Sequence, residues 1–260
     1  MTLLVDIGNT ALKWSTSEGG KLGHVQVELH RGQADGLERQ LMQAWRALAQ
    51  GTSGFGCSVA SESVRDAVER AAHACGRSLH WLASQDRFDG DFVLYNGYRN
   101  PVQLGADRWH GMLGACAHRP RQSIVLIAVG TATTIDCVEW YAEGSRFIGG
   151  CIAPGARLML DSLAQRTAGL PQARGNAVAF PDNTDDAIAT GVAEAQAGLA
   201  LRVIGRFAQR LGAAPAVIVS GGDADALAVR LQADGVALTI EHNLVLAGLA
   251  LRARTAHGSK

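Results

Sequence analysis

Two stretches of the chain share one pattern of apolar and polar positions, and the rest of the sequence is organised around them. The first, Leu3 to Ser15, reads LLVDIGNTALKWS, and the second, Ser123 to Trp140, reads SIVLIAVGTATTIDCVEW. Each is an apolar run, a short turn that contains glycine, and a second apolar run, which is typical of a β-hairpin. When Gly130 is aligned with Gly8, both strands and both turns coincide. The repeat predicts two similar lobes that face a shared cleft.

The first hairpin carries chemistry that an ordinary turn does not need. Asp6 ends an apolar strand, where an unpaired carboxylate is costly, and Asn9, Thr10 and Lys13 follow closely. Gly8 has no Cβ, so an anion can approach the backbone, and successive turn N–H groups form a concave anion site. Lys13 could neutralise phosphate charge, and Asp6 could hold a magnesium ion. The alternative is an ordinary hairpin with polar turn residues, and the buried-type position of the carboxylate argues against it.

Apolar spacing and turn residues predict the remaining elements. Helices are predicted over Ala34–Gln50, Ser63–Cys75, Ala106–His118, Ala156–Thr167, Thr184–Leu211, Asp223–Gln232 and Leu244–Ala253. Further strands are predicted over Gly23–His30, Gly54–Ala60, Leu79–Leu82, Phe92–Tyr98, Arg146–Ile152, Ala216–Val219 and Val236–Ile240. Gln85–Asp91 and the long segment Ala168–Asn183 are predicted to be irregular.

Composition narrows the class of protein. The chain has 260 residues, 47% of them hydrophobic and 18% charged, with a formal net charge of zero, so nucleic-acid binding is not expected. No basic leader precedes the first strand, and no uninterrupted apolar run approaches about 18 residues, so neither a signal peptide nor a membrane span is expected. The cysteine count is odd at five and no C-x-x-C occurs, which predicts free thiols in the cytoplasm and disfavours a zinc site.

Four segments resemble, in order along nearly the whole chain, the motifs of type III pantothenate kinases. They are DIGNTALK (Asp6–Lys13), NGYRNPVQLGADR (Asn96–Arg108), VGTATTID (Val129–Asp136) and GGCIAPG (Gly149–Gly155). The family includes Bvg accessory factor homologues and belongs to the acetate and sugar kinase, Hsp70 and actin superfamily. The GADR sequence after YxxP is the most diagnostic motif.

The resemblance implies an α/β fold of two actin-like, ribonuclease H-like lobes with mixed sheets, flanking helices and a nucleotide cleft between them. The first lobe would be 1–118, with the phosphate hairpin and the acceptor-binding segment. The second would be 119–260, with the second hairpin and an adenosine-contacting turn at Ser220–Gly222.

The activity implied is ATP-dependent phosphorylation of the primary alcohol of pantothenate to 4'-phosphopantothenate, the first step of coenzyme A biosynthesis. Asp107 would be the general base, Arg108 would hold the pantothenate carboxylate, and Asp6 would bind Mg²⁺. Residues implied to bind ATP are Asp6, Ile7, Gly8, Asn9, Thr10, Ala11, Leu12, Lys13, Thr131 and Thr133. Residues implied to bind pantothenate are Tyr98, Gly105, Ala106, Asp107, Arg108 and Thr184. From the residues alone, Arg108 could instead pair with a nearby carboxylate.

One position departs from the family pattern. Many members have an aspartate two residues before the second Gly-Thr turn, where it helps to hold a monovalent cation; here the residue is Ala128. The mode of any potassium or ammonium dependence is therefore open. The resemblance also implies a homodimer. Two alternatives are another small-molecule kinase or phosphatase of the same superfamily, and a non-catalytic regulator of the Bvg accessory factor kind.

Overall fold

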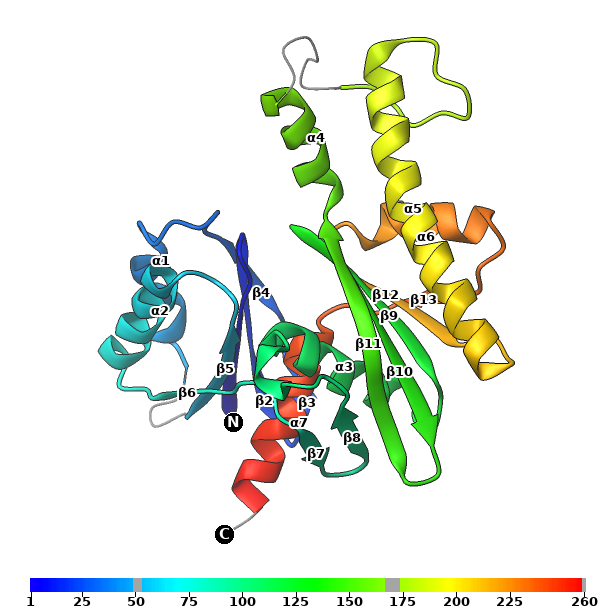
Figure 1. Cartoon of the computed structure of the whole chain (residues 1–260). Helices are drawn as coiled ribbons and strands as arrows, with labels where there is room; N and C mark the ends of the chain where they lie inside the picture. The colour runs from blue at the N-terminus through cyan, green and yellow to red at the C-terminus, as the bar shows by residue number, and fades with distance from the viewer. Residues whose placement is uncertain (49–52, 167–173, 259–260) are drawn as a thin grey trace. The chain divides into compact units, whose positions relative to one another are not determined.

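The computed structural model describes residues 1–48, 53–166 and 174–258, which form two compact units. The first unit holds Met1–Pro120, Ala142–Arg146 and Asn243–Lys260, and the second holds Arg121–Tyr141 and Phe147–His242. Each unit contains a mixed β-sheet with helices packed against it (Figure 1). The predicted α/β fold of two mixed sheets with flanking helices is confirmed.

The sheet of the first unit has the strand order β3-β2-β1-β5-β6, and β4 also pairs with β2. Its strands are β1 (Thr2–Ile7), β2 (Ala11–Glu18), β3 (Lys21–Leu22), β4 (Gln26–Leu29), β5 (Gly54–Ser58) and β6 (Leu79–Trp81). β1 pairs antiparallel with β2 and parallel with β5, so it is a central strand. A central strand is covered on both faces, which explains the unbroken apolar run Leu3-Leu4-Val5.

Alternation along β1 directs its side chains into two different cores. The odd-numbered apolar residues pack with α1 (Leu37–Trp45) and α2 (Glu62–Ala74), which lie side by side in Figure 1. Leu4 packs in the other core, against α7 (Leu244–Gly258). Asp6 follows Leu4 by two residues, so its carboxylate lies on the α7 side of the sheet.

The contact between α3 (Ala106–His118) and α7 explains why the last helix belongs to the first unit. A Cβ on Gly114 would lie 2.2 Å from the carbonyl oxygen of Leu244, and a Cβ on Gly248 would lie 2.0 Å from that of His110. These two glycines let the helix backbones approach closely. The predicted second lobe extended to the C-terminus, so its boundary is corrected here.

A β-hairpin precedes α3 in the first unit. β7 (Arg87–Asp89) and β8 (Val93–Asn96) pair antiparallel, and the 3₁₀ turn Pro101–Gln103 leads into the helix. The prediction of an irregular segment before residue 92 was wrong at β7. Phe88 is buried and packs 5.3 Å from Phe92 between ring centroids, which stabilises the paired strands despite their polar neighbours.

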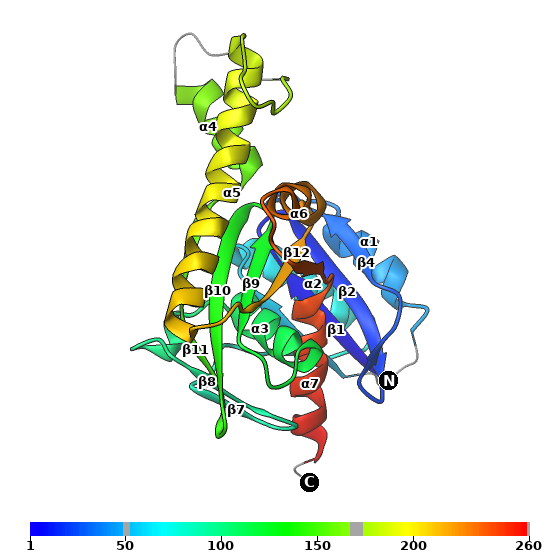
Figure 2. The same ribbon diagram turned by 90° about the vertical axis from the view of Figure 1, so that its right-hand side faces the viewer.

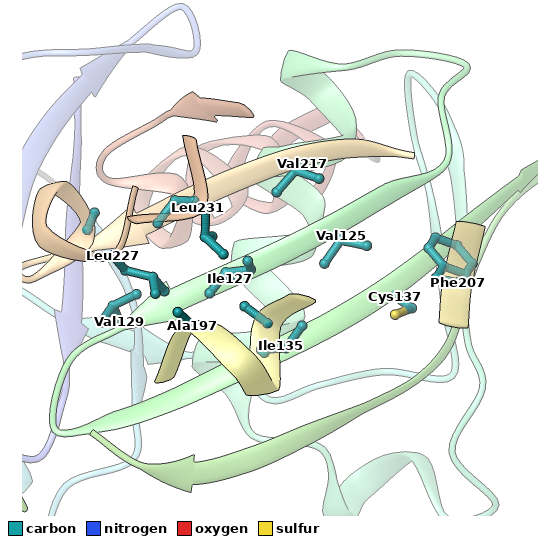
Figure 3. Packing of buried hydrophobic residues seen from close by; sticks show 13 residues of the cluster. Val125, Ile127, Val129, Ile135, Cys137, Ala197, Phe207, Val217, Leu227 and Leu231 are labelled. Carbon is teal, nitrogen blue, oxygen red and sulfur yellow. The ribbon is translucent and has the colours of Figure 1, made fainter. Parts of the chain in front are cut away.

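The second sheet has seven strands in the order β13-β12-β9-β10-β11-β8-β7. Apart from β7 and β8, its strands are β9 (Ile124–Val129), β10 (Ala132–Tyr141), β11 (Gly144–Pro154), β12 (Ala216–Gly221) and β13 (Leu238–Ile240). The helices of the second unit are α4 (Ala156–Arg166), α5 (Thr184–Leu211) and α6 (Ala224–Ala233). Figure 3 shows its core, in which one face of β9 and β10 packs with residues of α5 and α6, including Ala197, Phe207, Leu227 and Leu231.

The helix α5 begins and ends at residues suited to those positions. The Asn183 side chain accepts a hydrogen bond from the backbone N–H of Asp186 at 3.0 Å, and Gly212 ends the helix with φ 67°. By length and composition alone, α5 is the one helix of the described residues that could cross a membrane. Such evidence is weak for one helix, since core helices meet the same criteria, and α5 contributes Phe207 to the core.

Most predicted helices appear with ends shifted by a few residues. The largest shift of a helix start is in α1, which begins at Leu37 after Gly36 rather than at Ala34, and α7 continues past the predicted Ala253 to Gly258. Gly36 has φ 80°, a conformation that ends the preceding turn. Predicted residues 49–50 of that helix, residue 167 of the helix after Gly155, and 168–173 of the irregular segment lie outside the described residues.

Candidate active site

The first hairpin turn is closed by its own backbone. The N–H of Gly8 donates to the carbonyl of Ala11 at 3.0 Å, and Asp6 lies directly opposite Lys13 in the strand register. Opposed residues in an antiparallel pair share one face, so the carboxylate and the ammonium group are on the same side of the sheet. Asn9 is exposed at the tip of the turn.

His30 holds this turn from behind, a role that no pattern in the sequence indicated. Its ring Nδ1 accepts from the N–H of Gly32 at 3.0 Å, so the proton is on Nε2, which donates to the carbonyl of Gly8 at 3.0 Å. The backbone N–H groups of His30 and Arg31 both donate to the carbonyl of Thr10, at 3.0 and 2.8 Å. Three hydrogen bonds therefore fix the turn to the segment that follows β4, and a fourth, within that segment, orients the His30 ring.

Asp6 lies among groups that raise its proton affinity. Burial raises the pKa of Asp6 to about 7, and the negative charge of Asp107 adds to the rise. The charge of Lys13 and the thiol of Cys57, which donates to Asp6 Oδ1 at 3.6 Å, lower that pKa. Cys57 is opposite Asp6 in the β1–β5 register, a contact between strands that sequence spacing did not reveal. Two carboxylates so placed favour a cation beside them.

Asp107 and Arg108 start α3 in adjacent positions. The Asp107 carboxylate accepts from the backbone N–H of Arg108 at 2.7 Å, and a Cβ on Gly105 would lie 2.6 Å from Asp107 Oδ1. Gly105 thus leaves room for the carboxylate in that position. Burial raises the pKa of Asp107, while the backbone hydrogen bond and the charge of Arg108 lower it.

The Arg108 guanidinium is buried beside Tyr98. Its Nη1 donates to the Tyr98 hydroxyl at 2.9 Å, and its carbon lies 5.6 Å from the ring centroid. Asn96 holds the segment that carries Tyr98: it accepts from the Tyr98 N–H and donates to the carbonyls of Gln85 and Pro101, at 3.1, 3.0 and 3.2 Å. Tyr98, Gly105, Ala106, Asp107 and Arg108 therefore lie in one unit, on a braced segment.

One turn further along α3, His110 is fully buried and should make stability depend on pH. Burial lowers its pKa from 6.5 to about 3, Arg252 acts in the same direction, and the hydrogen bond with the Ala106 carbonyl opposes them. Below about pH 6.5 the His110 side chain therefore binds a proton in the unfolded chain, whereas in the folded chain it stays neutral down to about pH 3. Stability attributable to His110 is full above pH 6.5 and is lost as the pH falls towards 3.

Between about pH 7.5 and pH 5, we expect the free energy of unfolding to fall by ~2 kcal/mol less in His110→Leu than in the unmodified protein. The measurement is urea unfolding at both pH values. His73→Gln, at an exposed position of α2, is the matched control and should leave the pH dependence unchanged. An unaltered pH dependence in His110→Leu would show that other groups cause the acid loss.

The second hairpin lies in the other unit and has a tighter turn. The N–H of Gly130 donates to the carbonyl of Ala132 at 3.1 Å, one residue nearer than the corresponding bond in the first hairpin. Two glycines pack against it: a Cβ on Gly155 would lie 2.0 Å from the carbonyl oxygen of Gly130, and one on Gly221 2.0 Å from that of Val129. The GGCIAPG segment therefore packs against this turn through Gly155, and the Ser-Gly-Gly segment packs against the residue before the turn through Gly221.

The two threonines of the second hairpin differ in exposure. Thr131 is exposed, and its carbonyl accepts from the N–H of Gly155 at 2.9 Å. Thr133 is fully buried, and its hydroxyl donates to the side-chain oxygen of Gln196 on α5 at 2.5 Å. Gln196 was not among the predicted site residues, since a glutamine in a long helix gives no sequence signal of its own.

Thr184 starts α5 and lines an apolar cavity of about 560 Å³ between α4 and α5, which lie side by side in Figure 2. The cavity is lined by Met159, Ser162, Leu163, Thr184, Ala187, Ile188, Gly191, Val192 and Ala195. The structure therefore separates the predicted site residues into a first-unit set and a second-unit set of Thr131, Thr133 and Thr184.

Nowhere in the described ranges do three or more His, Cys, Asp or Glu side chains gather as an all-protein metal cage. Mg²⁺ does not need such a cage, because it is commonly held by one or two carboxylates together with substrate phosphates. Asp6, whose pKa is raised by burial and by Asp107, fits that donor set.

Solved structures similar over the whole chain place the fold in the actin-like class. One is a conserved protein described as a Baf family transcriptional activator from Campylobacter jejuni, with a TM-score of 0.57 and 20% identity, covering 98% of this chain and 99% of that one. Another is component A of (R)-2-hydroxyglutaryl-CoA dehydratase from Acidaminococcus fermentans, with a TM-score of 0.54 and 15% identity, covering 99% of both chains. These likenesses concern the fold alone.

Sequence comparison is more specific. Residues 2–206 match the family model of type III pantothenate kinase. The protein is 40% identical over 254 residues to a type III pantothenate kinase of Laribacter hongkongensis, covering 98% of this chain and 99% of the relative. It is also 40% identical over 256 residues to one of Chromobacterium violaceum, covering 98% and 100%. The chain belongs to the type III pantothenate kinase family.

Proposed function

We propose that this protein transfers the terminal phosphoryl group of ATP to the primary alcohol of pantothenate. The product is 4'-phosphopantothenate, and the reaction is the first step of coenzyme A biosynthesis. The observation that carries the proposal is that two carboxylates of one unit lie near each other, Asp6 at the end of β1 and Asp107 at the start of α3, so that the charge of Asp107 raises the pKa of Asp6. One suits a metal beside the donor phosphates, and the other suits a base beside the acceptor alcohol.

The acceptor side uses the braced segment of the first unit. Asp107 orients the alcohol and accepts its proton as the bond to phosphorus forms, a role helped by the raised pKa of its carboxyl group. Arg108 binds the carboxylate of pantothenate, because a guanidinium can donate two parallel hydrogen bonds. Tyr98 and the backbone of Gly105-Ala106 bound the acceptor, and Thr184 contacts it.

The donor side uses both hairpins. In the first, Asp6 binds Mg²⁺, Lys13 neutralises phosphate charge, and the turn from Ile7 to Leu12 lines the phosphates. In the second, the turn contacts the phosphates at the exposed Thr131, while Thr133 belongs to the ATP site from the buried side of the turn. Mg²⁺ supplies charge neutralisation on the phosphates when bound. Phosphoryl transfer needs little covalent help from the protein, so positioning and charge account for most of the catalysis.

A coupled assay of the purified protein with pantothenate, ATP and Mg²⁺ tests the proposal. We expect ADP release that depends on pantothenate, with 4'-phosphopantothenate identified by mass spectrometry. A panel of other primary alcohols is the control for substrate choice. Phosphorylation of another alcohol in place of pantothenate would contradict the substrate, and absence of any transfer would contradict the activity.

Ala128 should weaken any activation by potassium or ammonium. It lies opposite Thr134 in β10 and Ser220 in β12, so its two cross-strand partners carry hydroxyl groups rather than carboxylates. A carboxylate gives a cation the strongest Coulomb attraction at contact distance. We expect activation to need higher cation concentrations than in relatives with aspartate, and Ala128→Asp to lower the activating concentration.

The measurement is activity against potassium and ammonium concentration, in a buffer with a bulky inert cation. Ala128→Asn is the matched control, because asparagine has nearly the same shape as aspartate but carries no charge. Saturation of the unmodified protein at low cation concentration would contradict this reading of Ala128. A loss of folding in Ala128→Asp alone would indicate an uncompensated buried charge.

We also propose a homodimer. Leu158 on α4 is 44% exposed and Phe180, just before α5, is 94% exposed, so the second unit has apolar surface available for a contact. An isologous contact would bury such surface about a two-fold axis. Light scattering at micromolar concentration should give twice the chain mass, and a monomer mass would contradict the proposal. The cytoplasmic location and the absence of nucleic-acid and membrane partners stay predictions.

A further inference from the structure

Two polar side chains meet in the interior of the second unit, behind the second hairpin. The hydroxyl of Thr133 is fully buried and donates to the side-chain oxygen of Gln196 at 2.5 Å. Gln196 is 4% exposed and comes from the middle of α5, 63 positions further along the chain. Buried polar groups are costly unless they are paired, so this contact keeps two such groups satisfied.

Gln196 also uses its amide nitrogen. Nε2 donates to the carbonyl of Pro154 at 2.9 Å and lies 3.3 Å from the sulfur of Met159. Pro154 is the last residue of β11, and Met159 is on α4. Gly155, which follows Pro154, donates its N–H to the carbonyl of Thr131 at 2.9 Å. The end of β11 therefore contacts both Gln196 and the hairpin turn. One side chain thus connects β10, β11, α4 and α5.

This arrangement gives the hydroxyl of Thr133 a different use from that of a phosphate ligand. A hydroxyl has a single proton, and here that proton is donated to Gln196. The exposed Thr131 lies two residues before Thr133, so any shift of Thr133 along β10 would move the turn and its N–H groups. The orientation of the turn therefore depends on a bond made on its buried side.

We propose that Gln196 is a positioning residue for ATP binding. Through its hydrogen bonds with Thr133 and Pro154, it holds the second hairpin in the orientation that receives phosphate. The inference rests on the proposed use of this hairpin for ATP. Gln196 touches no substrate itself. Losing it should weaken nucleotide binding and leave pantothenate binding nearly unchanged. The acceptor residues Tyr98, Asp107 and Arg108 lie on other elements, and Thr184 is at the start of α5, twelve positions before Gln196.

The discriminating variant is Gln196→Met, which keeps the length of the side chain and removes its amide. The probe is the β,γ-methylene analogue of ATP with Mg²⁺, titrated by calorimetry, with steady-state KM values for ATP and pantothenate measured in parallel. We expect about a ten- to hundred-fold loss of analogue affinity, the range for supporting contacts of a binding site, and a pantothenate KM within about two-fold. Gln209→Met, at an exposed position near the end of α5, is the matched control.

Three further variants test the pairing. Thr133→Val should lose affinity, Thr133→Ser should retain it, and Thr133→Val with Gln196→Met should lose no more than Gln196→Met alone, because both remove one shared bond. If Gln196→Met does not fold, the contrast of Thr133→Val with Thr133→Ser, together with Gln196→Leu, makes the same test.

Several outcomes would overturn the inference. If Thr133→Val loses affinity for the ATP analogue while Gln196→Met binds it normally, Thr133 would be a direct phosphate ligand instead. Multiplicative losses in the double variant, an equal rise in both KM values, or an unmodified protein that does not bind the analogue would also contradict it. Transfer to an alcohol other than pantothenate would contradict the proposed substrate only, since analogue affinity would still report on Gln196.

Discussion

Replacing Asp107 with asparagine is expected to lower turnover by about two to four orders of magnitude, the usual range for a positioned acid or base. Asparagine keeps the shape and an oxygen that can accept from the N–H of Arg108, as the carboxylate does at 2.7 Å. It cannot accept the proton of the acceptor alcohol. The loss should therefore appear in kcat, with KM values changed little, and is measured with the coupled assay.

A control separates this role from the general effect of a carboxylate in the first turn of a helix. Glu62 is the exposed first residue of α2, and Glu62→Gln removes a comparable charge there. Its turnover should be normal. Turnover of Asp107→Asn within a few-fold of the unmodified protein would remove Asp107 from the proposed mechanism.

Replacing Arg108 with lysine is expected to raise the pantothenate KM about ten- to hundred-fold while the ATP KM stays within about two-fold. Lysine keeps the charge but cannot make the two parallel hydrogen bonds of a guanidinium, and hydrogen bonds to charged groups are worth about 1.5–3 kcal/mol. The measurement is a full two-substrate kinetic analysis.

Arg108 also donates to the Tyr98 hydroxyl at 2.9 Å, so a structural role is the alternative. Tyr98→Phe removes that bond and leaves the guanidinium in place, and we expect a smaller rise in the pantothenate KM. Equal rises in both KM values for Arg108→Lys, together with lowered unfolding free energy, would support the structural role instead.

Much of the first-unit site could be predicted because it depends on local geometry. Asp6 and Lys13 flank one short turn, so any hairpin there brings them to the same face of the sheet. Asp107 and Arg108 follow Gly105 at the start of a helix whose apolar spacing was clear. The residues that support the site were not predictable in this way. His30, Cys57 and Gln196 are separated by 22, 51 and 63 positions from the residues they hold, and none of the three lies in a sequence motif.

The sequence by itself determined the two hairpins, the class of fold and the family, because periodicity, turn chemistry and motif order are written in neighbouring residues. Only the tertiary structure decided that α7 joins the first unit, through Gly114 and Gly248, and that Thr133 faces Gln196 rather than solvent. These outcomes depend on which helix packs on which strand. That choice follows from close contact between surfaces far apart in the chain, which spacing along the sequence does not encode.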